Sequence, residues 1–108
     1  MSIDWSKMKT AADMAAEQAQ AKYDVWKAER LERVNAIVVE VNGLRFDGDE
    51  ESQNRMARAV AAADMLLDTV EWTLADNTVA VVTAQELKAA CRLAGEAQTV
   101  IWNEGRPA

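Results

Sequence analysis

The residues best suited to chemistry are the carboxylates of the acidic run DGDEE, which extends from Asp47 to Glu51. Asp, Gly and Asp in alternation are typical of the start of a calcium-binding loop, but the later oxygen ligands and the bidentate glutamate at the twelfth position are missing. Asp47 and Glu50 instead have the spacing of a capping box, and Asp49 is an alternative N-cap. A helix start also favours negative charge. We therefore predict a helix cap here and no metal site.

Cys91 is the only thiol of the chain, which contains no histidine. A nucleophilic cysteine needs a neighbouring base or a strongly lowered pKa, and no base is evident near this residue. The sequence also has no glycine-rich phosphate loop and no clustered metal ligands. We therefore expect a buried, inert thiol, no catalytic residue, no cofactor and no enzymatic activity. A single cysteine also excludes an internal disulfide and fits a reducing compartment.

Length and composition predict one ordered domain. The 108 residues are 50% hydrophobic and 28% charged, an ordinary globular balance. Eighteen acidic against twelve basic residues give a net charge of −6, and the scattered Lys and Arg form no phosphate-binding patch, so nucleic acid is not expected as a partner. No run approaches the ~18 consecutive apolar residues of a membrane span, and the N-terminus lacks the order of a secretory signal. Synthesis in the cytoplasm without membrane insertion is expected.

Two β-hairpins are predicted from turn chemistry. The first turn is Asn42-Gly43 and the second is Asp76-Asn77, because Asn, Asp and Gly tolerate the positive φ that two-residue turns need. Either turn brings apolar side chains together on one face of its hairpin. The expected pairs are Val41–Leu44, Glu40–Arg45 and Val39–Phe46 in the first hairpin, and Leu74–Val79 and Trp72–Val81 in the second.

An amphipathic helix is predicted after each hairpin. The first extends from about residue 50 to 67, and the second begins at the capping box formed by Thr83 and Glu86. Gly95 inside the second helix costs about 1 kcal/mol relative to Ala, so we interpret it as the mark of a close packing contact. The apolar stripes are Met56, Ala59, Val60, Ala63 and Leu67 in the first helix, and Leu87, Cys91, Ala94, Ala97 and Ile101 in the second.

The first thirty-odd residues predict a long helix from about residue 4 to 33, because they lack Gly and Pro and are rich in strong helix formers. At 1.5 Å per residue it is roughly 45 Å long, more than a domain of this size needs, so part of it is expected to project. Its stripe could lie along the domain's own sheet, against a second copy, or against another protein. Large aromatic residues dominate many interfaces. We therefore predict partner binding by Trp5, Met8, Tyr23 and Trp26, which share the stripe with Ala12, Ala15 and Ala19.

These elements predict the α+β class, with a long N-terminal helix followed by hairpin, helix, hairpin and helix. Four short strands cannot hide one face alone, so a single small antiparallel sheet covered by helices is expected. Residues 1–33 are interpreted as an attachment or oligomerisation helix. Residues 34–108 are interpreted as a small α+β domain that folds without it.

Two separate blocks share a pattern of turn and helix-start residues. The first comprises Gly43, Phe46, Asp47, Asp49, Glu50, Ser52 and Arg55, and the second comprises Trp72, Asp76, Asn77, Thr83, Ala84, Glu86 and Leu87. In this pattern, residues 34 to 102 resemble a domain of unknown function found in tailed-phage proteins, many of which are tail-fibre or tail-fibre-assembly proteins. The N-terminal helix departs from that family, whose members often carry longer, different leaders.

The resemblance implies a non-enzymatic structural protein of a bacteriophage tail that acts through protein–protein contacts at the tail fibre or baseplate. Its expected partners are a tail-fibre or baseplate protein and, through the N-terminal helix, further copies of itself. Its expected location is the virion, after synthesis in the host cytoplasm. Two alternatives remain open: a tail-fibre assembly chaperone absent from the mature virion, and a small acidic phage protein that inhibits a host factor by masking a basic surface.

Overall fold

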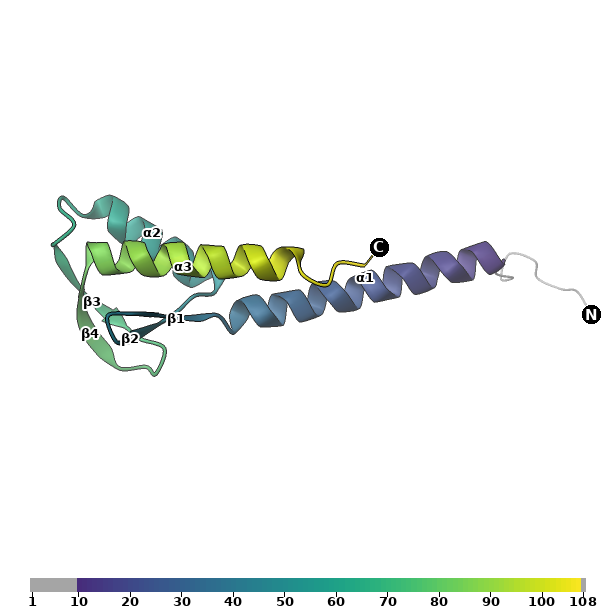
Figure 1. Ribbon diagram of the computed structural model, residues 1–108, viewed down its shortest axis with the longest axis horizontal. Coiled ribbons are helices and arrows are strands. Elements are labelled where there is room, and N and C mark those ends of the chain that lie inside the picture. Colours follow the sequence, from purple (N-terminus) through teal and green to yellow (C-terminus); the bar gives the residue numbers. More distant parts are fainter. Residues whose placement is uncertain (1–9, 108) are drawn as a thin grey trace, which may run out of the picture.

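The computed structural model describes residues 10–107 as three helices and two β-hairpins, with one helix projecting from the rest (Figure 1). The α+β class and the predicted order of elements are confirmed. The elements are α1 (Ala11–Asn35), β1 (Val38–Val41), β2 (Leu44–Asp47), α2 (Glu50–Ala62), β3 (Thr69–Thr73), β4 (Val79–Thr83) and α3 (Ala84–Asn103).

The prediction of a single sheet is wrong, because each hairpin forms its own two-stranded antiparallel sheet. The two hairpins touch through a backbone hydrogen bond in which the N–H of Ala75 donates to the carbonyl oxygen of Arg45 at 2.9 Å. Each hairpin also lays apolar side chains against the same helical core. Each sheet is therefore covered on one face without edge-to-edge pairing between the hairpins.

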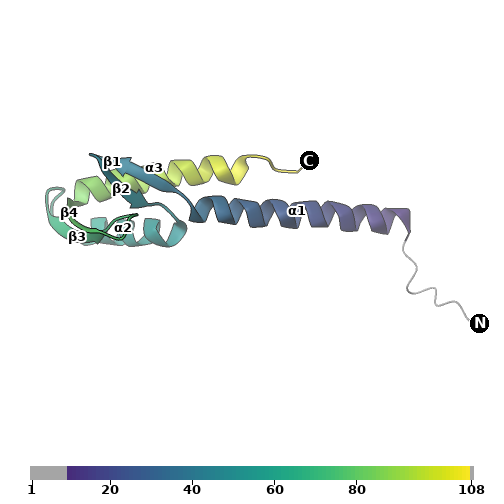
Figure 2. The ribbon, with the colours of Figure 1, turned by 90° about the horizontal axis from the view of Figure 1, so that it is seen from below.

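The body of the molecule, residues 34–107, is built around α3. This helix packs against α1, α2, β1 and β4. Figures 1 and 2 show the hairpins gathered around its N-terminal half, with α1 antiparallel beside its C-terminal end. The main core is centred on Phe46, Met56, Val82 and Leu87, and a second cluster of Val34, Ile37 and Ala94 fixes the end of α1.

The first hairpin forms as predicted. Asn42 and Gly43 have φ values of 52° and 80°, the left-handed conformation that the tight turn requires. The expected register is confirmed, so Phe46 is completely buried opposite Val39. Strand alternation therefore directs the apolar side chains of β1 and β2 to the core.

The register of the second hairpin is wrong by one residue. Its turn has three residues, Ala75 to Asn77, instead of two. Asn77 takes a positive φ of 65° and donates its N–H to Leu74 O at 2.9 Å, which is the pattern of a type I turn followed by a left-handed residue. Trp72 consequently lies opposite Ala80 and not opposite Val81.

The longer turn exchanges the two faces of β4. Leu74 and Val82 are buried, whereas Val79 and Val81, which we placed on the apolar face, are both more than 60% exposed. Every residue from Val79 to Val82 is apolar, so hydrophobic alternation does not distinguish the two registers.

The structure describes α1 from Ala11, and the predicted start near residue 4 lies outside the described residues. Thr10 is the N-cap and forms a capping box with Asp13, the two N–H to side-chain oxygen distances being 3.1 and 3.2 Å. The predicted end of the second helix is wrong. α2 ends at Ala62 and not near residue 67. Leu67 therefore lies in an exposed loop and not on the apolar stripe of α2.

The capping box at the start of α3 is confirmed. Thr83 Oγ1 accepts from the N–H of Glu86 at 3.1 Å, and the Glu86 carboxylate accepts from the N–H of Thr83 at 3.0 Å. This backbone hydrogen bond is the main reason that the pKa of Glu86 is lowered. Asn42 also donates to Glu86 at 3.3 Å, so the first hairpin turn is tied to the start of α3.

Two glycines of the body have opposite surroundings. At Gly48 a Cβ atom would lie 2.5 Å from Cγ2 of Ile37, so only glycine allows this close approach. At Gly95 the nearest atom to a Cβ is Oε1 of Gln53, at 3.8 Å. Our interpretation of Gly95 as a close packing contact is therefore wrong, because an alanine would fit there.

Candidate functional site

The outer half of α1, Ala11–Val25, is the most exposed regular element of the described chain. Every residue from Thr10 to Val25 is exposed. Figure 1 shows this half extending beyond the body. An isolated helix of about 15 residues is only marginally stable in water, because its backbone hydrogen bonds barely exceed the cost of nucleation. A second helix or protein surface is the natural source of further stabilisation.

The inner half of α1 is held by a cluster that we name the tryptophan clamp, formed by Trp26, Arg30, Trp102 and Glu104. Trp26 is 8% exposed and donates its Nε1–H to Glu104 O at 2.9 Å. The Arg30 guanidinium lies over both rings, 4.5 Å from the centroid of Trp26 and 3.6 Å from that of Trp102. Cation–π contacts of this kind strengthen when the groups are shielded from water.

Glu104 completes the clamp through its side chain. Its carboxylate accepts from Arg33 at 2.9 Å, although both side chains remain about half exposed, so this pair adds little stability. Gly105 follows with a φ of 68° and passes 3.9 Å from the Trp26 ring, measured from the position of a Cβ. The chain after α3 therefore folds back onto α1, which no helical periodicity in the sequence indicated.

The four predicted partner-binding residues do not form one exposed stripe within the described part of the chain. Trp5 and Met8 lie outside the described residues. Tyr23 is 37% exposed and contacts Trp26 in a tilted arrangement with ring centroids 5.3 Å apart, and the Lys27 ammonium lies 5.0 Å from the Tyr23 centroid. Trp26 itself is occupied within the clamp. Whether these residues bind a partner stays a prediction.

The outer half of α1 has two apolar faces. At 3.6 residues per turn, the stripe with Ala12, Ala15 and Ala19 continues the side that carries Trp26. Met14 and Val25, which are 52% and 57% exposed, lie on the opposite side, together with Ala21. Our sequence prediction missed this second face, although the spacing 14, 21 and 25 carries its signal.

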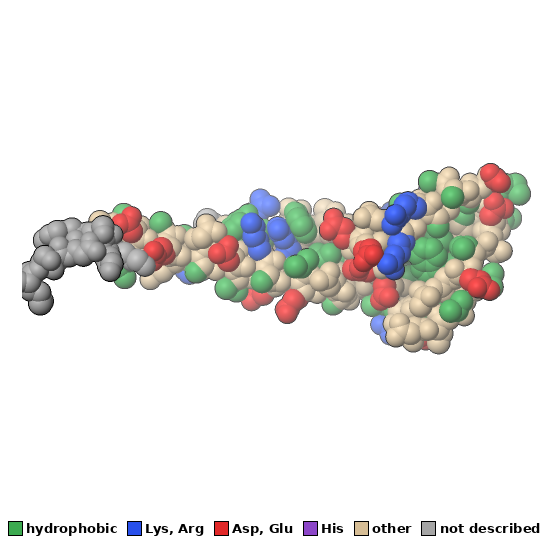
Figure 3. Space-filling model, turned by 180° about the vertical axis from the view of Figure 1, so that it is seen from behind, with side chains coloured by type: hydrophobic (Ala, Val, Ile, Leu, Met, Phe, Trp, Pro, Cys, Tyr) green, Lys and Arg blue, Asp and Glu red, His purple; other side chains and the backbone are tan. Residues whose placement is uncertain are grey.

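Charge is distributed unevenly along α1. Residues 11–21 contain Asp13 and Glu17 and no Lys or Arg, whereas the four cations of α1 lie between Lys22 and Arg33. Figure 3 shows carboxylates over the end of α1 far from the body and basic groups nearer to it. A surface that binds the outer half therefore meets the negatively charged side chains of the first turns of α1.

The acidic run lies at the start of α2. Asp49 occupies the N-cap position but makes no side-chain hydrogen bond to a backbone N–H of the helix, and its carboxylate accepts from the hydroxyl of Ser52. Asp47 belongs to β2, so the alternative cap replaces the predicted Asp47–Glu50 box. Glu51 pairs with Arg55 at 2.7 Å. Within residues 10–107, no three Asp, Glu or Cys side chains are grouped closely enough to hold a metal ion.

A groove runs between α2 and α3, and we name it the α2–α3 groove. Two hollows of about 380 Å³ each lie along it. The residues that line the two hollows recur every three or four positions along α2 and along α3. The two hollows therefore belong to one continuous groove between the same faces of these helices. The apolar end is lined by Ala57, Val60, Ala61, Lys88, Cys91 and Arg92, and the polar end by Glu50, Gln53, Asn54, Gly95, Gln98, Thr99, Trp102 and Asn103.

Cys91 lies at the apolar end of this groove. It is half-buried, contacts the main core, and donates its thiol to Gln53 O at 3.5 Å. The predicted position on the apolar side of α3 is therefore right, but burial is incomplete.

The comparisons with known proteins identify a family without a described function. The model of a domain of unknown function, DUF4376, matches residues 16–106, and the chain therefore belongs to this family. The match includes most of α1. No curated protein and no solved structure gives a significant match. No helix within residues 10–107 is long and apolar enough to cross a lipid bilayer.

Proposed function

We propose that this chain is a non-enzymatic structural protein of a phage tail and that it attaches to a tail-fibre or baseplate protein through the outer half of α1. The phage context comes from the resemblance of its two hairpin-and-cap blocks to tailed-phage proteins. The mode of action comes from α1. Every residue of this half is exposed over about four turns, so no other element of the described chain covers it.

The body supports this proposal by presenting α1 in a fixed direction. The tryptophan clamp and the buried Val34 hold the inner half of α1 against α3 at both ends. Because the two halves form one uninterrupted helix, the outer half projects from a rigid base. A preoriented helix loses less conformational entropy on binding than a flexible segment.

Mass spectrometry of purified phage particles tests the proposal. The chain is expected in the particle at a copy number that follows the symmetry of the fibre or baseplate. A chain found bound to fibre protein in the infected cell but missing from particles is an assembly chaperone instead. A chain absent from both, and recovered with a basic host protein, supports inhibition of a host factor and contradicts a role in the tail.

A further inference from the structure

We propose that the α2–α3 groove binds the outer half of α1 from a second copy of this chain. The inference rests on the proposed role of α1 as an attachment helix and names its occupant. The groove extends along α3 from Lys88 to Trp102, which is roughly 21 Å at 1.5 Å per residue. The outer half of α1 is also roughly 21 Å long by the same measure. One helix therefore fills the groove.

The floor of the groove admits a close helix. Small residues form part of the lining, namely the exposed Ala57 and Ala61 of α2 and the half-buried Gly95 of α3, where the body has room for a Cβ atom. Glycine inside a helix lowers helix stability, so its presence without a packing reason in the chain points to a neighbour that enters from outside. An alanine-rich helix is the kind of neighbour that approaches such a floor closely, by the same packing rule that small residues follow in helix pairs.

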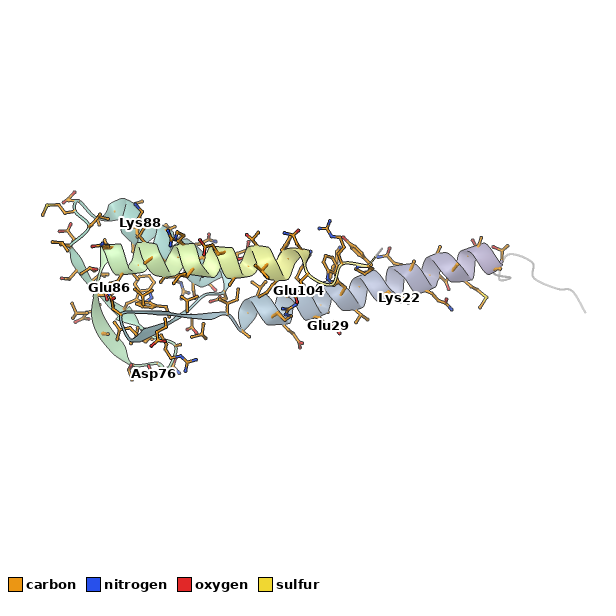
Figure 4. The ribbon with its side chains drawn as sticks, viewed as in Figure 1. Lys22, Glu29, Asp76, Glu86, Lys88 and Glu104 are labelled. Atoms are coloured by element: carbon orange, nitrogen blue, oxygen red, sulfur yellow. The ribbon has the colours of Figure 1, made fainter. Side chains whose placement is uncertain are left out.

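Charge fixes the direction in which the helix lies. Lys88 and Arg92 are one turn apart on the rim of the apolar end, and Asp13 and Glu17 are one turn apart on α1. Figure 4 shows Lys88 on the side of α3 that faces α2. Arg92 also touches Glu96 at 3.7 Å, an exposed pair that leaves its guanidinium accessible. Pairing the two acids with the two bases sets the second α1 parallel to α3.

The same orientation of the second copy's α1 also places Lys22 near a residue of opposite charge. With Met14 and Ala21 turned to the floor, the right-handed winding of α1 turns Asp13 and Glu17 toward α3 and Lys22 toward α2. Lys22 then approaches the polar end, which contains Glu50.

Charge exchange tests the pairing in sedimentation velocity measurements of the full chain. Asp13→Lys with Glu17→Lys, or Lys88→Glu with Arg92→Glu, is expected to lower the self-association constant by about tenfold or more. The fourfold variant that combines both pairs is expected to regain association, although it keeps the weakened cap of α1. Glu40→Lys with Glu71→Lys is the matched control for the Asp13 and Glu17 pair, because it changes the net charge by the same amount and sign but on the hairpins. A chain that is monomeric at every concentration overturns the inference.

Filling the groove separates binding from folding. Gly95→Leu is expected to raise the melting temperature, because a helix former replaces glycine, and to abolish self-association, because the side chain occupies the floor. Unchanged association of a folded Gly95→Leu variant contradicts the placement. Binding of a tail protein by that variant is expected to persist, because the outer half of α1 is unchanged. A parent chain that self-associates but binds no tail protein contradicts the proposed function and not this inference.

A disulfide locates the contact. In the Met14→Cys variant, oxidation is expected to link the introduced thiol to Cys91 of another copy, because both lie near the apolar end of the proposed contact. Adding Cys91→Ala is expected to abolish that covalent species. Leu31→Cys is the control, because Leu31 is exposed but lies outside the outer half of α1. Equal cross-linking of Cys91 by either introduced cysteine overturns the inference.

Discussion

The two halves of α1 are built from similar helix-forming residues but have opposite surroundings. The inner half contributes Trp26 and Val34 to buried contacts with the body, whereas every residue of the outer half is exposed. Both halves belong to one continuous helix. Helix propensity therefore determines where α1 forms, whereas a few large side chains determine which part of α1 packs against the body.

The largest expected difference is between two truncations, one in the body and one in the outer half. Phe46→Ala is expected to lower the free energy of unfolding by about 4 kcal/mol, because it opens a cavity in the main core. Met14→Ala is expected to change it by less than about 0.5 kcal/mol. Urea denaturation followed by circular dichroism measures both. A cost for Met14→Ala as large as that for Phe46→Ala contradicts the division of α1.

The next test removes the clamp. Trp26→Ala is expected to cost about 3 kcal/mol, near the lower end for a buried tryptophan, because the ring is lost together with its hydrogen bond to Glu104. Its neighbour Val25, more than half exposed, supplies the control Val25→Ala, which should be nearly neutral. Hydrogen exchange should show protection lost along α1 and retained in the hairpins. Equal protection of α1 in both variants argues against the clamp.

The first hairpin and the second show how much of this fold the sequence predicts. Asn42-Gly43 permits only a tight two-residue turn, and the apolar side chains of the first hairpin alternate, so turn and pattern select the same register. In the second hairpin the strand from Val79 to Val82 is apolar on both faces, and Asn77 alone takes the left-handed conformation. The one-residue error follows from that missing alternation.

The candidate site was less predictable than the fold. In the sequence, Trp26 is a large aromatic residue on the stripe of a long helix, as an interface residue would be. Only the structure shows that residues 104 and 105 fold back and cover its ring. The α2–α3 groove depends on which faces of two helices remain open after packing, which periodicity within one helix does not reveal. Gly95 was noticed, but whether a Cβ fits there is a property of the neighbouring helix.

Substitution of two glycines next to or within α3 compares a closely packed position, Gly48, with an open one, Gly95. Gly48→Ala is expected to destabilise the body by about 2 kcal/mol, because its Cβ would overlap Ile37. Gly95→Ala is expected to stabilise it by about 1 kcal/mol, because alanine favours the helix and fits the space. Thermal unfolding distinguishes the signs. A destabilising Gly95→Ala would restore our first interpretation of this glycine as a packing contact.

The two capping boxes of the chain sharpen the comparison further. Thr83→Ala, at the start of α3, is expected to cost about 1 kcal/mol of global stability. Thr10→Ala removes the equivalent cap from the exposed end of α1 and should fray that end without a measurable change in global unfolding. Equal losses in chemical denaturation would show that the outer half of α1 unfolds together with the body.

The smallest expected effect is the pH dependence of the α3 cap. The pKa of Glu86 is lowered below its ordinary value of 4.5, mainly by the N–H of Thr83. Its contribution is therefore fully present above pH 4.5 and is lost as the pH falls below this value through the lowered pKa. Glu86→Gln should make stability less dependent on pH in that window. A steeper loss in the variant than in the parent chain contradicts the assigned hydrogen bond.

The central claim, that the outer half of α1 attaches the molecule while the body folds alone, is tested most directly by deleting residues 1–22 and leaving Tyr23, Trp26 and Val34 in place. We expect the shortened chain to keep a melting temperature within about 2 °C of the parent, since no buried contact is removed from the described residues, and to lose binding to its own copies and to the tail. A fall of more than about 5 °C, or unchanged binding, would contradict the claim.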